Sequence, residues 1–174
     1  MKRTYESDDI VSFVEAAKAY CRLIEERESY TLASFIEACT PLLATLYLRA
    51  TTLPDIEDLS DDKVSGPITT DEWKVLFKNL SEYLGKYNMY SDVFDPVLVD
   101  EAEVTSGSLA DDLADIYRDL KNGFLIIEQE NGNTIGDVIW EWKFSFGTHW
   151  GVHLTGALRV LHSLRYSHLN EDYL

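Results

Sequence analysis

Hydrophobic residues recur at helical spacing along most of the chain. The first stripe runs through Ile10, Val14, Ala17, Cys21 and Ile24, which are separated by four and three residues in turn. This period is typical of one face of an α-helix and differs from the alternation of a strand. Comparable stripes predict helices near residues 8–28, 32–50, 70–85, 109–130, 135–146 and 148–166. No segment has a convincing strand pattern, so we expect an all-α, single-domain bundle of about five to six helices.

Residues with specific roles at helix ends support these boundaries. The first four helices each follow a side chain that favours the N-cap, namely Ser7, Thr31, Thr69 and Ser108. Pro41 predicts a kink or a break in the second helix. The segment from Gly147 to Gly151 predicts another kink or break in the last helical stretch.

Two acidic loops separate the helices, at residues 51–69 and 97–107. The first lacks the ligand spacing of a calcium-binding EF-hand loop. Between the loops, the stretch YSDVFDP (Tyr90 to Pro96) is expected to form one short helical turn.

The excess of acidic over basic residues limits the kinds of partner that the chain is expected to bind. There are 31 Asp and Glu against 15 Lys and Arg, which gives a net charge of −16. Nucleic acid and anionic membranes are disfavoured, because both attract basic surfaces. A basic protein partner or a divalent metal would be favoured, although an acidic surface also simply aids solubility. With two cysteines, no signal peptide and no apolar run of membrane-spanning length, the chain reads as cytoplasmic.

The stretch THWGVH contains the best candidates for chemistry. His149 and His153 lie one helical turn apart, a spacing that a metal ion can bridge. Zinc proteases with such a pair carry a Glu directly after the first His, whereas this chain has Trp150. On a continuous helix both histidines share a stripe with Trp142, so they are either metal ligands or hydrogen-bonded core residues.

A metal site would also need carboxylates, and SLADDLAD supplies them. A helical wheel places Asp112 and Asp119 at the boundary of the apolar face and Asp115 on the solvent side. The candidate site therefore consists of His149 and His153, with Asp112 or Asp115 as a further ligand or base.

Aromatic residues crowd the same C-terminal region. Trp140, Trp142 and Trp150 fall within eleven residues. They would form a partner surface if exposed, or pack between helices if buried.

The segment DLADIY resembles part of the all-α nucleotide pyrophosphatases, in which two acidic helix motifs hold magnesium ions on a triphosphate. That resemblance would assign Asp112 and Asp115 to the second motif. The first would have to come from Glu25, Glu26 and Glu28, which do not keep its spacing. Clustered Lys or Arg residues for the triphosphate are also missing from the sequence.

Longer stretches, SLADDLADIYRDLKNG and WEWKFSFGTHWGVHLTGALRVLHSL, resemble an uncharacterised bacterial family that carries a domain of unknown function. The resemblance covers most of the chain and is strongest from Ser108 to Leu164. It implies an all-α bacterial protein and no particular activity.

Three functional hypotheses follow. The first is an acidic binding or regulatory protein without catalysis of its own. The alternatives are a metal-dependent hydrolase that uses the histidine pair and, less favoured, a magnesium-dependent nucleotide pyrophosphatase. The oligomeric state is left open by the sequence.

Overall fold

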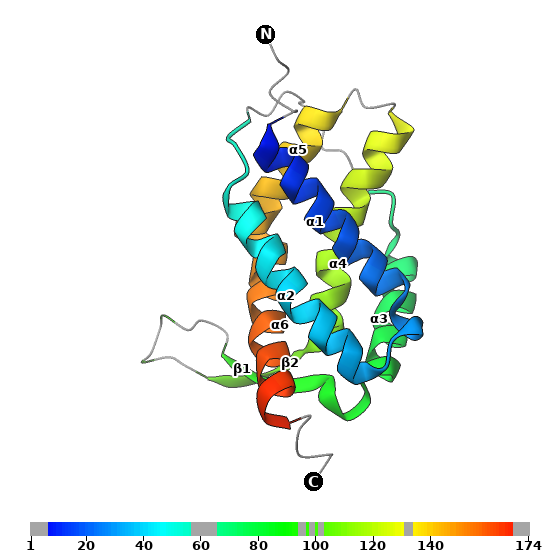
Figure 1. The fold of residues 1–174 in the computed structure, drawn as a ribbon, viewed down its shortest axis with the longest axis vertical. Helices are drawn as coiled ribbons and strands as arrows, with labels where there is room; N and C mark the ends of the chain where they lie inside the picture. Colours follow the sequence, from blue (N-terminus) through cyan, green and yellow to red (C-terminus); the bar gives the residue numbers. More distant parts are fainter. Residues whose placement is uncertain are drawn as a thin grey trace.

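The fold is an all-α bundle, as the hydrophobic spacing predicts (Figure 1). The computed structural model describes residues 7–56, 66–93, 97, 100, 103–130 and 134–168. Its α-helices are α1 (Asp8–Glu25), α2 (Leu32–Thr51), α3 (Thr70–Leu84), α4 (Leu109–Gln129), α5 (Ile135–Ser145) and α6 (Gly151–Ser163). Shorter helical turns are η2 (Arg27–Ser29), η3 (Gly85–Tyr87), η5 (Phe146–Trp150) and η6 (Leu164–His168). The expected loop at 51–69 lies partly outside the described residues, and residues 94–96 of the expected helical turn lie wholly outside them.

Helix α4 occupies a central position in the bundle. It packs against α1, α3, α5 and α6, while α2 packs against α1 and α6 (Figure 1). The core between these helices is mainly aliphatic. It includes a group of aromatic rings, in which Phe13 and Trp142 lie 5.3 Å apart and Phe146 and Trp150 lie 4.7 Å apart. None of the helices in the described ranges is both long enough and apolar enough for a bilayer crossing.

The N-caps form where the sequence predicts them. Ser7, Thr31 and Ser108 each accept a hydrogen bond from a backbone N–H in the first turn of the following helix. Thr69 and Glu72 form a complete capping box at the start of α3. These contacts are local, which is why the sequence suffices to locate them.

The helix α2 continues through Pro41 from Leu32 to Thr51, so the predicted break is absent. Pro41 lacks the N–H that would bond the carbonyl of Glu37, and both residues are exposed. Water can therefore bond that carbonyl. Thr40 does not recap the chain; its hydroxyl donates to the carbonyl of Ile36 at 2.7 Å within the same helix.

The chain also contains a β-hairpin that the sequence analysis missed. Strands β1 (Met89–Val93) and β2 (Val104–Ser108) pair in antiparallel register, with Tyr90 opposite Gly107. The expected helical turn at Tyr90 is therefore wrong, and the second acidic loop is shorter than expected. No residue of either strand is fully buried, so the hairpin lacks the buried apolar face from which strands are recognised in a sequence.

The expected irregularity between Gly147 and Gly151 is a π-helical turn, η5, that joins α5 to α6 without ending the helix. A Cβ atom at Gly151 would collide with the carbonyl oxygen of Phe146, so this position requires glycine. A π turn inserts one extra residue into a helix, and such turns are frequent at functional sites.

Candidate metal centre

Two histidine–aspartate pairs connect η5 and α6 to α4. His149 Nδ1 lies 2.8 Å from Asp119 Oδ2, and His153 Nδ1 lies 2.9 Å from Asp112 Oδ1. The two imidazole rings are neighbours, with centroids 5.0 Å apart. The sequence places Asp112 and Asp119 at the edge of the core face of α4. In the structure Asp119 is half-buried, as at such an edge, whereas Asp112 is buried.

Asp115 belongs to the same cluster, contrary to the helical wheel that placed it in solvent. It is 6% exposed, and its Oδ2 lies 3.4 Å from His153 Nε2. The wheel assumes one covered face, whereas α4 is covered by several helices, including α6 on the side of Asp115. On its other oxygen, Asp115 forms an ion pair with Arg118 Nη2 at 2.6 Å.

The hairpin contributes a residue that the sequence analysis did not assign to the site. Tyr90 donates a hydrogen bond from its hydroxyl to Asp112 Oδ2 at 2.7 Å. A side chain at Gly107 would overlap the Tyr90 ring, and the Cβ of one at Gly156 would lie 3.0 Å from the Tyr90 hydroxyl oxygen. The two glycines therefore make room for Tyr90 between β2 and α6, where it fixes the orientation of Asp112.

These contacts determine which nitrogen of each imidazole is available. An ionised carboxylate can only accept hydrogen bonds, so Asp112 and Asp119 place the proton on Nδ1 of a neutral His153 and His149. The Nε2 lone pairs are then available to a ligand. A histidine that binds a metal through one nitrogen and donates the other N–H to a carboxylate is the usual arrangement in protein metal sites.

The remaining donor atoms converge on one another. One donor atom each from Asp115, His149 and His153 lie mutually within 4.8 Å. Two ligands on a tetrahedral zinc ion at ordinary bond lengths are separated by about 3.3 Å. The 3.4 Å between His153 Nε2 and Asp115 Oδ2 already matches that value.

The surrounding acids alter the protonation of His153. Burial disfavours its charged form, but the hydrogen bond to Asp112 and the fields of Asp112, Asp115 and Asp111 outweigh burial and raise the pKa of His153. Burial and the neighbouring Asp115 raise the pKa of Asp111. In the absence of a metal, the cluster therefore stabilises a protonated His153.

The cluster lies at the surface and not deep in the core. The side chains of His149 and His153 are 39% and 23% exposed, whereas those of Asp112 and Asp115 are 8% and 9% exposed. An ion held by both histidines would thus have solvent on one side and buried carboxylates on the other.

Two of the three tryptophans are buried and so cannot contribute to the partner surface that the sequence left open. Trp142 and Trp150 are 1% and 0% exposed, and the Trp150 indole donates to the carbonyl of Trp142 at 3.0 Å. Trp140 is half-buried and stacks on Phe144 with ring centroids 5.0 Å apart. Packing between helices, the other alternative, therefore accounts for Trp142 and Trp150.

The residues assigned to the two acidic motifs of the pyrophosphatase hypothesis make contacts with different residues. Asp112 and Asp115 contact His153, whereas Glu25 bonds Tyr117 and Lys121. The motif halves therefore do not share one set of contacts, which removes the geometric support for that hypothesis.

Comparison with known proteins identifies relatives of this chain. The crystal structure of protein BF1032 from Bacteroides fragilis is similar, with a TM-score of 0.79 and 27% sequence identity over 95% of this chain and 97% of that chain. No curated protein matches the chain. Residues 4–167 match a family described as a domain of unknown function, DUF5063, which covers the bundle and the histidine–aspartate cluster. The chain therefore belongs to the DUF5063 family, in agreement with the resemblance of its C-terminal half.

Proposed function

We propose that this protein binds a divalent transition-metal ion through Nε2 of His149, Nε2 of His153 and the carboxylate of Asp115. The observation that carries the proposal is the pairing of both Nδ1 atoms with carboxylates, at 2.8 Å to Asp119 and 2.9 Å to Asp112. That pairing leaves Nε2 of each ring for a ligand, and donor atoms of Asp115, His149 and His153 lie mutually within 4.8 Å.

The donor set points to a borderline ion such as Zn²⁺ or Fe²⁺. Two imidazoles and one carboxylate suit these ions, whereas Mg²⁺ and Ca²⁺ prefer oxygen ligands. Three protein ligands leave at least one coordination position for water, and the exposed edge of His149 gives solvent access to it. A bound Zn²⁺ lowers the pKa of its water, so the arrangement favours a metal-dependent hydrolase among the three sequence hypotheses.

Metal content tests the proposal directly. Protein purified without a histidine tag or chelator is analysed by mass spectrometry, and Zn²⁺ is titrated calorimetrically into the metal-free protein. Near one equivalent of metal is expected in the wild type. The double variant His149→Ala/His153→Ala should lose it.

The matched control is His162→Ala, since His162 is an exposed histidine on α6 that packs on Tyr166 and belongs to neither group of converging donor atoms found among the described residues. It should retain full metal content, and circular dichroism should show the same helix content in all variants. Wild-type protein without metal and without a heat of Zn²⁺ binding would contradict the proposal. The acidic binding-protein hypothesis would then take its place.

A further inference from the structure

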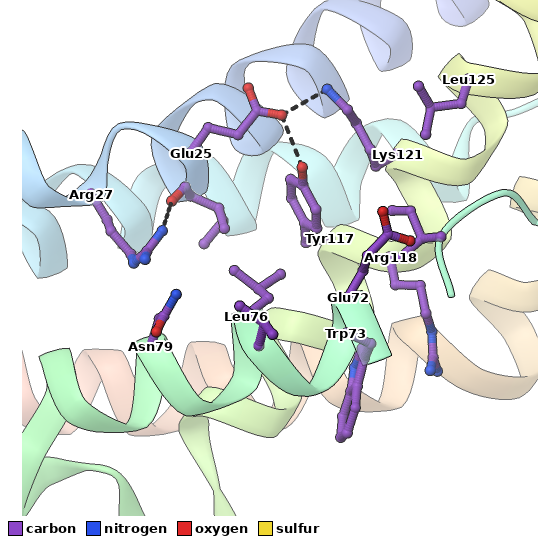
Figure 2. Close-up of a pocket in the computed structure, with 13 residues that line it drawn as sticks. Glu25, Arg27, Glu72, Trp73, Leu76, Asn79, Tyr117, Arg118, Lys121 and Leu125 are labelled. Carbon is purple, nitrogen blue, oxygen red and sulfur yellow. Dashed lines mark hydrogen bonds and ion pairs between the residues drawn. The ribbon is translucent and has the colours of Figure 1, made fainter. Parts of the chain in front are cut away.

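A pocket lies between α1, α3 and α4 (Figure 2). Its volume is about 430 Å³, which is within the range of small-molecule pockets. The walls are mainly apolar and include Ile24, Leu76 and Leu125, and Trp73 and Tyr117 add aromatic surface. No residue of the proposed metal centre lines this pocket.

Three basic side chains of an otherwise acidic chain line this pocket, namely Arg27, Arg118 and Lys121. Lys121 is paired with Glu25 at 2.7 Å. Arg118 is paired with Asp115 and lies over the Trp73 ring, 5.5 Å from its centroid. Two of the three cations therefore already have close acidic partners.

Arg27 differs from the other two cations. It is 8% exposed, yet its acidic neighbour Glu28 lies 3.5 Å away with a side chain that is 84% exposed. Its Nη1 donates to the carbonyl of Ile24 at 3.1 Å, and its buried Nε has no hydrogen-bond partner. A buried charge with a weak partner is costly, so this position favours a further anion.

The orientation of Arg27 places that anion inside the pocket. Figure 2 shows its guanidinium reaching from η2, which follows α1, toward Asn79 on α3. Trp73, another lining residue, also has a buried indole N–H without a partner. Figure 2 shows the Trp73 ring directed away from the space between α1 and α3. The unused donor beside the apolar wall is therefore that of Arg27.

We infer that the pocket between α1, α3 and α4 binds a small organic anion with an apolar body, whose carboxylate lies against the Arg27 guanidinium. The apolar body packs against Ile24, Leu76 and Leu125. The inference does not depend on the metal centre, because the two sites share no ligand residue.

The experiment is an NMR titration of the ¹⁵N-labelled, metal-free protein with octanoate. The N–H signal of Arg27 Nε should shift in a saturable manner. Octylammonium, which has the same apolar chain and the opposite charge, should bind at least tenfold more weakly. The same titration in the presence of Zn²⁺ should give the same result.

Two variants and one control make the site assignment specific. Arg27→Gln should weaken octanoate binding at least tenfold, and Asn79→Trp should fill the mouth of the pocket and abolish binding. Lys78→Gln removes an exposed charge of α3 that does not line the pocket and should bind octanoate like the wild type. Unsaturable shifts, equal binding of octylammonium, or unchanged binding in folded Asn79→Trp protein would each overturn the inference.

Discussion

His153 and Asp112 join α6 to α4 through a 2.9 Å contact between Nδ1 and Oδ1, and Tyr90 from the hairpin holds the other oxygen of the same carboxylate. Three segments far apart in the sequence therefore determine the orientation of one imidazole ring. The neighbouring acids stabilise the protonated form of this ring. The stability of the metal-free protein should therefore depend on pH.

Metal-free protein should lose stability as pH rises from the ordinary pKa of histidine. The pKa of His153 is raised in the folded state, so its stabilising contribution is complete below about 6.5 and is lost as pH rises through the folded value. The measurement is the free energy of unfolding in urea between pH 5.5 and 9. His153→Gln should lack this component of the pH dependence, while His162→Gln should keep it. Parallel pH profiles for wild type and His153→Gln would contradict the assignment.

The carboxylate behind His149 should affect metal affinity without binding the ion. Asp119→Asn replaces a carboxylate that orients the ring with a neutral amide, and such changes typically weaken metal binding by roughly 10–100-fold. Calorimetric titration with Zn²⁺ measures this directly. Asp137→Asn, an acid of α5 outside the cluster, provides the control. Equal Zn²⁺ affinity of wild type and Asp119→Asn would show that Asp119 has no part in the site.

Gly123 should be intolerant of a side chain. A Cβ atom there would overlap the indole ring of Trp142, which is itself buried. Gly123→Ala should lower the free energy of unfolding by about 1–3 kcal/mol, the usual cost of overpacking. A Cβ atom at Gly147 would have no neighbouring atom within 4 Å. Gly147→Ala should therefore leave the free energy of unfolding unchanged or raise it by up to about 1 kcal/mol. Denaturation in urea distinguishes the two, and equal stability of both variants would contradict the packing argument.

The two thiols should be inert in the folded protein. Burial raises the pKa of Cys21 and of Cys39 to about 12, and the thiolate is the reactive form. A thiol-specific disulfide reagent at pH 8 should label neither cysteine within the time in which it labels both in urea. Rapid labelling of the native protein would show that one of the two helices opens readily.

The sequence predicts those features that depend on neighbouring residues. Helix positions and N-caps such as Thr69 follow from local spacing and local hydrogen bonds. The burial of Asp115 could not be predicted, because it depends on which helix covers the second face of α4. The hairpin was missed because its strands have no buried apolar face, and the unpartnered Nε of Arg27 has no counterpart in any sequence pattern.

The position of the histidine pair could be predicted only in part from the helical spacing of the sequence. A regular wheel places Trp142, His149, Trp150 and His153 on one buried stripe. In the structure the two tryptophans are buried, whereas the histidines are half-buried against α4. The extra residue in η5 changes the phase of the helix by about 100° after this point, which a regular wheel does not include.

The π turn also makes the length of this segment a determinant of the site. Deletion of Thr148 would allow η5 to become a regular α-helical turn, with every ligand residue still present in the chain. The whole of α6 would then rotate by about 100° relative to α5, and His153 would leave the face that meets Asp112. In relatives of this protein, an insertion or deletion between Phe146 and Gly151 should therefore break the contacts between the histidines and the aspartates. This should hold even where the sequence keeps both histidines together with Asp112, Asp115 and Asp119.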